Sequence, residues 1–134
     1  MERETAEILH NHLQLCQWED DLEFLCFMLC EIAIPHGPEI RYAAQAMDLS
    51  DYIKTIDRAC DSPGSRLNEL LPETEKHALK SCLQHTKRIR NIVAHRIPTH
   101  DGAMRKKEAT VQSAISILDS VIKRAAERYR VSQV

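Results

Sequence analysis

Glycine and proline are scarce in this chain, and this scarcity limits the fold classes that the chain can adopt. Only three glycines and five prolines occur among 134 residues. Sandwiches and barrels need a turn signal roughly every ten residues, so this composition excludes most all-β folds. Runs of β-branched residues are also rare. The sequence therefore predicts an all-α protein, and its length predicts a single helical domain that spans residues 1–134.

Long apolar runs and a disulfide framework are missing as well. The longest apolar run, Phe24–Cys30, is far too short to cross a bilayer. Met1 is followed by Glu2-Arg3-Glu4-Thr5, which is unlike the basic start of a signal peptide. Five cysteines, an odd number, argue against a set of paired disulfides. Because Cys26 and Cys30 lack clear further metal ligands, we expect them in the core. Together these features predict a cytoplasmic protein without membrane contact, bound metal or cofactor.

Charge is unevenly distributed, although the net charge is only −2. Residues 1–31 carry eight acidic side chains and one arginine, whereas residues 80–107 carry eight basic side chains and one aspartate. A basic segment of this kind is a candidate surface for a polyanion. The alternative is that the acidic and basic regions neutralise each other, within one chain or between two chains.

Hydrophobic spacing predicts four long helices. The first runs from about Arg3 to Ile34, the second from about Glu39 to Cys60, the third from Pro72 to a stop at or before Ile97, and the fourth from about Ala103 to Tyr129. The phase of the second helix slips at residues 48–50, which indicates a kink or a new helix cap, and residues 66–71 form a short extra turn. Because short connections make neighbouring helices antiparallel, we expect an up-down four-helix bundle with a long first helix.

The second half of the first helix is apolar on almost every side. A helix of this kind needs more cover than one neighbouring layer provides. Either the other helices of the bundle wrap it, or a second subunit covers its outer face.

The segment at the end of the third helix holds the side chains best suited to chemistry. Arg90 can hold a phosphate through two parallel hydrogen bonds, and His95 can move a proton near neutral pH. Asn91 can both donate and accept. Cleavage of a phosphodiester beside a 2′-hydroxyl needs a base, an acid and positive charge on the phosphorane, and it needs no metal. The neighbouring cations Lys87, Arg88 and Arg96 are candidates to attract RNA.

Helix geometry complicates this site. Residues five apart on an ideal helix lie about 140° apart around its axis, so Arg90 and His95 do not share one face. Asn91 and His95 are four residues apart and do share one. Arg90 can reach His95 only through its long side chain, a distorted helix end, or a second copy of the motif across a two-fold axis.

These residues carry a resemblance to a known superfamily. The segment Arg90–His95, an arginine and a histidine separated by four residues with Asn91 directly after the arginine, resembles the Arg-x(4–6)-His motif of the HEPN superfamily. The resemblance implies a helical bundle acting as a homodimeric, metal-independent endoribonuclease that leaves 2′,3′-cyclic phosphate ends. It implies Arg90, Asn91 and His95 as catalytic residues. One toxin branch of the superfamily has a tyrosine two residues after the histidine, where this chain has Ile97.

The same resemblance leaves the biological role open between several classes. Members of the superfamily act as toxins, in phage defence or in RNA processing, which implies an antitoxin or a defence-system protein as a partner. The main alternative is a non-catalytic HEPN-like module that binds a partner protein, such as a nucleotidyltransferase, or a nucleotide. A third possibility is a helical adaptor whose basic segment complements an acidic partner. In that case Arg90 and His95 point apart, even across a dimer.

Overall fold

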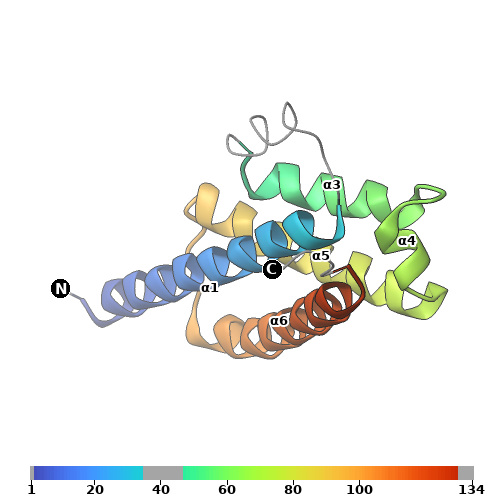
Figure 1. Cartoon of the computed structure of the whole chain (residues 1–134). Helices are drawn as coiled ribbons and strands as arrows, with labels where there is room; N and C mark the ends of the chain where they lie inside the picture. The colour runs from blue at the N-terminus through green and yellow to red at the C-terminus, as the bar shows by residue number, and fades with distance from the viewer. Residues whose placement is uncertain (1, 35–46, 130–134) are drawn as a thin grey trace.

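The structure is a computed structural model that describes residues 2–34 and 47–129. Within these ranges every regular element is a helix, as the composition predicts. The helices are α1 (Arg3–Ala33), α3 (Leu49–Asp61), α4 (Arg66–Leu70), α5 (Glu73–Ala94) and α6 (Asp101–Tyr129), which Figure 1 shows packed side by side. None of these described helices is both long enough and apolar enough to cross a membrane.

Helix α1 is continuous over 31 residues, so the prediction of one long first helix is confirmed. It packs against α3, α5 and α6 and is the central element of the described fold. Its buried side chains include Leu15, Leu22 and Leu29, which repeat at the predicted seven-residue spacing. The other helices cover most of its second half, but Phe24 remains 60% exposed. The bundle therefore wraps α1 only in part.

One continuous hydrophobic core joins the described helices. Cys26, Cys30, Cys60 and Cys82 belong to it as free thiols, which confirms the core assignment of Cys26 and Cys30. Trp18 is half-buried and lines, together with Met104 of α6, a cavity of about 450 Å³ between α1 and α6.

The predicted slip at residues 48–50 marks the start of a new helix. Asp48 caps α3: its carboxylate accepts a hydrogen bond from the backbone N–H of Asp51, and the carboxylate of Asp51 accepts one from the backbone N–H of Asp48. This reciprocal pair satisfies two backbone donors that a helix start otherwise leaves open. The first half of the predicted second helix, 39–46, lies outside the described residues.

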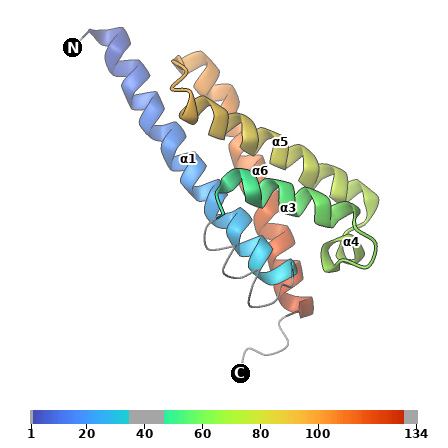
Figure 2. The same cartoon turned by 90° about the horizontal axis from the view of Figure 1, so that it is seen from above.

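The direction of the helices differs from the predicted up-down order. Figures 1 and 2 show α1, α3 and α6 running in the same general direction, with α5 running against them. The prediction assumed a short loop between the first two helices, which would make them antiparallel. The second helix was predicted to begin at about residue 39, but residues 39–46 lie outside the described residues, and the described helix α3 begins at Leu49.

Contacts at the far end of the bundle fix α6 to α4 and α5. The guanidinium of Arg124 forms an ion pair with Glu75 and donates a hydrogen bond to the backbone C=O of Leu70, at 3.2 Å. The hydroxyl of Tyr129 donates to the backbone C=O of Arg66 at 2.9 Å, and the Arg66 guanidinium lies 4.8 Å from the Tyr129 ring centre. The candidate site lies at the opposite end of α5.

Candidate functional site at the end of α5

Helix α5 ends at Ala94, before Pro98 as predicted, and a defined hydrogen-bond pattern closes it. The backbone N–H of Arg96 donates to Val93 C=O at 3.1 Å, and that of Ile97 donates to Ile92 C=O at 3.0 Å. This pair of bonds is the Schellman arrangement, in which the residue after the C-cap adopts a left-handed conformation. That residue is Arg96, with φ of 50°.

Arg96 occupies a position that normally favours glycine. For a residue with a Cβ, the left-handed conformation is roughly 1–2 kcal/mol higher in energy than the right-handed one. Among the described residues other than glycine, Arg96 is the one with positive φ. The helix end that carries the candidate motif is therefore held under local backbone strain, directly after the C-cap residue His95.

The loop that follows is fastened to α1. The Nδ2 of Asn11, a buried side chain, donates to Thr99 C=O at 2.8 Å and to Asp101 Oδ1 at 3.0 Å. A carboxylate oxygen of Glu7 accepts a bond from the backbone N–H of Asp101 at 2.8 Å. Asn11 is the polar member of the otherwise apolar stripe of α1 formed by Ile8, Asn11, Leu15, Trp18 and Leu22, and this contact explains its place there. These bonds position the segment between α5 and α6, and hence the end of α5.

Asp101 does not cap the fourth helix, although an aspartate just before the predicted start of that helix, about Ala103, is a common capping residue. The backbone C=O of His100 accepts the first bonds of α6, from Ala103 and Met104, both at 3.0 Å. Asp101 is already the first residue of that helix, and its carboxylate instead accepts the bond from Asn11.

Arg90 is half-buried and turns toward the acidic side of α1. Its Nη1 donates to Asn91 Oδ1 at 3.3 Å. Partial burial raises the pKa of Glu19 on α1, Glu23 and Asp20 raise it further, and the positive charge of Arg90 opposes them. Backbone hydrogen bonding from Asp51 lowers the pKa of the cap residue Asp48, and Arg90 contributes to this lowering. Arg90 therefore lies in the field of carboxylates from two other helices.

His95 is exposed, and its side chain forms no hydrogen bond or ion pair with any residue in ranges 2–34 and 47–129. In the structure a hydrogen bond thus joins Arg90 and Asn91, but none joins His95 to either of them. This outcome follows the angular argument, because five residues on a helix separate Arg90 and His95 by about 140°.

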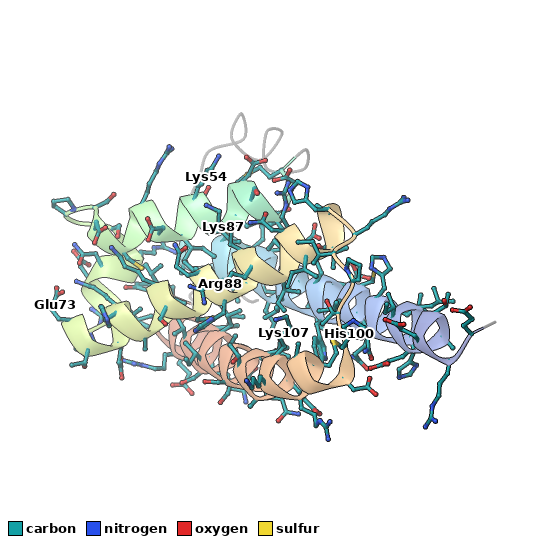
Figure 3. The ribbon with its side chains drawn as sticks, turned by 180° about the vertical axis from the view of Figure 1, so that it is seen from behind. Lys54, Glu73, Lys87, Arg88, His100 and Lys107 are labelled. Atoms are coloured by element: carbon teal, nitrogen blue, oxygen red, sulfur yellow. The ribbon has the colours of Figure 1, made fainter. Side chains whose placement is uncertain are left out.

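The three predicted RNA-binding cations point in different directions. Figure 3 shows Lys87 on the side of α5 next to α3, and Arg88 on the side next to α6. Arg96 follows the C-cap and is exposed, as are Lys87 and Arg88. On α6, Lys106 and Lys107 share a cavity with Arg88. Both lysines belong to the basic segment 80–107, but only the packing of α5 against α6 brings them to one cavity with Arg88.

One acidic cluster could supply oxygen ligands to a cation. Single carboxylate oxygens of Glu19, Asp20 and Glu23 lie within 4.8 Å of one another. Two of the three are half-buried, and Arg90 is close enough to affect the pKa of Glu19. The positive charge of Arg90 therefore already offsets part of the negative charge of this cluster.

Comparison with known proteins adds no relative. The chain matches no protein-family model, no curated protein and no solved structure.

Proposed function

We propose that the protein is a metal-independent endoribonuclease of HEPN type that acts as a homodimer. The observation that carries the proposal is the grouping at the end of α5, where Arg90 donates to Asn91 and where the unpartnered imidazole of His95 faces solvent. An arginine for the phosphate, an amide to orient it and a free imidazole for the proton are the groups that this reaction requires.

The proposed reaction is an internal transesterification. His95 of one copy removes the proton from the 2′-hydroxyl, and the 2′ oxygen forms a bond to phosphorus. Arg90 stabilises the charge on the five-coordinate phosphorane, and Asn91 orients the phosphate or His95. The bond from phosphorus to the 5′ oxygen then breaks, and a protonated imidazole supplies the proton that the leaving oxygen needs. The products are a 2′,3′-cyclic phosphate and a 5′-hydroxyl.

The homodimer is part of the proposal because one copy leaves Arg90 and His95 apart. A two-fold axis beside the end of α5 would place the Arg90 of one copy near the His95 of the other. Exposed apolar side chains support such an interface. Ile97, two residues after His95, is 47% exposed, and Leu13 and Phe24 of α1 are 61% and 60% exposed. Leu13 and Phe24 lie within about 20° of each other on an ideal helix.

The decisive experiment compares His95→Ala with His77→Ala. His77 is an exposed histidine at the other end of the same helix, so its removal matches the chemical change without touching the motif. Purified proteins are incubated with RNA in EDTA, and the product ends are analysed. We expect cleavage by wild type and His77→Ala to give cyclic phosphate ends, and His95→Ala to be slower by about 10²–10⁴-fold. Equal cleavage by His95→Ala would overturn the assignment.

A non-catalytic, HEPN-like module that binds a partner protein or a nucleotide is the second candidate. One observation favours it: the positive charge of Arg90 acts to lower the pKa values of Glu19 and Asp48, so carboxylates of the same chain partly neutralise that charge. This candidate predicts no cleavage by the wild-type homodimer. It also predicts that Arg90→Gln, which removes the charge, changes stability more than it changes any activity on RNA.

A further inference from the structure

A basic cavity lies between α5 and α6, on the side of α5 away from Arg90. Its volume is about 210 Å³, and residues of both helices line it: His85, Arg88, Ile89, Ile92, Lys106, Lys107 and Thr110. This is smaller than the roughly 300–1,000 Å³ of pockets for drug-sized ligands. Figure 3 shows Arg88 on α5 and Lys107 on α6 on the same face of the molecule. Two lysines, an arginine and a histidine thus line a space suited to one small anionic group.

The cations of this cavity are not neutralised by the chain. Arg88, Lys106 and Lys107 form no ion pair with a carboxylate within the described ranges. Some other cations on the same two helices are paired, among them Lys80 of α5 with Asp61, and Lys123 of α6 with Asp119 at 2.9 Å. The positive charge around the cavity is therefore available to an anion from outside.

A contact between two residues that line the cavity, Arg88 and His85, leaves another donor free. Arg88 Nη1 lies 3.5 Å from His85 Nδ1. A guanidinium only donates, so Nδ1 of a neutral His85 accepts and its proton is on Nε2. Nε2–H can then donate to an anion. The lining thus combines charge with directed donors, which is what a phosphate requires.

The cavity continues along the helices as a groove. A second cavity of about 410 Å³ shares His85 and Thr110 with the first. Small side chains, such as Ala78 and Ala109, leave it open between α5 and α6. A phosphate held at the basic end would therefore have room beside it for an attached sugar and base.

The basic cavity also lies on the His95 side of α5. Arg88, Ile92 and His95 are four and three residues apart, so Arg88 and His95 fall within about 20° around an ideal helix and about 10 Å along it. Arg90 lies about 160° from Arg88 on the same helix. A strand bound in the groove would therefore be directed toward the imidazole of His95.

We infer that the α5–α6 groove binds a backbone phosphate of single-stranded RNA through Arg88, Lys106 and Lys107, with His85 as an additional donor. The choice of RNA rests on the proposed function, but the binding itself requires no cleavage. The same phosphate chemistry could be presented by a free nucleotide, so the experiment compares both.

The test measures the binding of a 2′-O-methyl RNA, which cannot be cleaved, by fluorescence anisotropy. The variant Lys106→Gln/Lys107→Gln is compared with Lys80→Gln/Lys123→Gln, which removes the same amount of charge outside the groove, one lysine from α5 and one from α6. At about 0.1 M salt each lost phosphate contact weakens single-strand binding by about fivefold, so we expect the groove variant to bind about 25-fold more weakly. The salt dependence, as the slope of log K against log salt, should fall by about 1.4. The control should change binding less than twofold.

Several results would overturn the inference. Absence of RNA binding by the wild type, or an equal loss in both double variants, would show that the groove is not a specific phosphate site. Equal affinity for adenosine monophosphate and the RNA would assign it to a free nucleotide. Because cleavage is not measured, this test remains valid if the ribonuclease proposal fails. If the wild type does not cleave RNA but the groove variant still loses RNA binding, the groove assignment stands and the catalytic assignment is wrong. Arg88→Gln provides a second, independent variant.

Discussion

Replacement of Asn11 by leucine should destabilise the fold through the segment between α5 and α6. The change keeps the side-chain size but removes the donor to Thr99 C=O and Asp101 Oδ1. Thr99 is buried, at 6% exposure, so its carbonyl would be left without this partner. An unsatisfied buried group costs about 1–3 kcal/mol, whereas water can replace the bond to Asp101, which is exposed. We therefore expect the free energy of unfolding to fall by about 1–3 kcal/mol.

Urea unfolding followed by circular dichroism measures this change, and thermal unfolding provides a second value. For a chain of 134 residues the expected loss corresponds to a fall in Tm of about 4–11 °C. The matched control is Gln17→Leu, on the same helix, because Gln17 Nε2 donates only to the exposed Asp21, at 3.0 Å. The control should change stability by less than about 0.5 kcal/mol. If Asn11→Leu is as stable as Gln17→Leu, the contact with the loop does not support the fold as argued.

Two further predictions concern backbone strain and the buried thiols. Arg96→Gly should raise the free energy of unfolding by about 1 kcal/mol, because glycine adopts the left-handed conformation without strain. Arg96→Ala keeps a Cβ and should not raise it. If both variants have equal effects in urea titrations, Arg96 is not strained. Burial raises the pKa of Cys60 from 9.0 to about 11, and those of Cys30 and Cys82 to about 12. The folded state then retains protons that the unfolded state loses, so under reducing conditions stability should fall as pH rises from about 9 to 11; a constant urea midpoint over that range would contradict this.

Helical spacing predicted the interior of each long helix well, because burial on one face imposes a regular repeat. Leu15, Leu22 and Leu29 are buried as the repeat requires, and the slip at residues 48–50 marks a real helix start. The direction of α3 relative to α1 could not be derived in this way. It depends on how the two helices pack, and the hydrophobic phase of each helix does not define that direction.

The candidate site was predictable only in part. Spacing along a helix already indicated that Arg90 and His95 point apart, and it placed Asn91 near both. The acidic environment of Arg90 was not predictable, because Glu19 and Asp48 come from helices far away in sequence. The groove cations on α6 were missed for the same reason: their relation to Arg88 depends on how α5 and α6 pack against each other.

The place of Trp18 gives the molecule a built-in optical probe. It is the single tryptophan of the chain, and it is half-buried in the cavity between α1 and α6. Its emission therefore reports the packing of α1 on α6, near the contacts that hold the end of α5. A shift in that emission without loss of helicity would signal that α1 separates from α6 before the helices unfold.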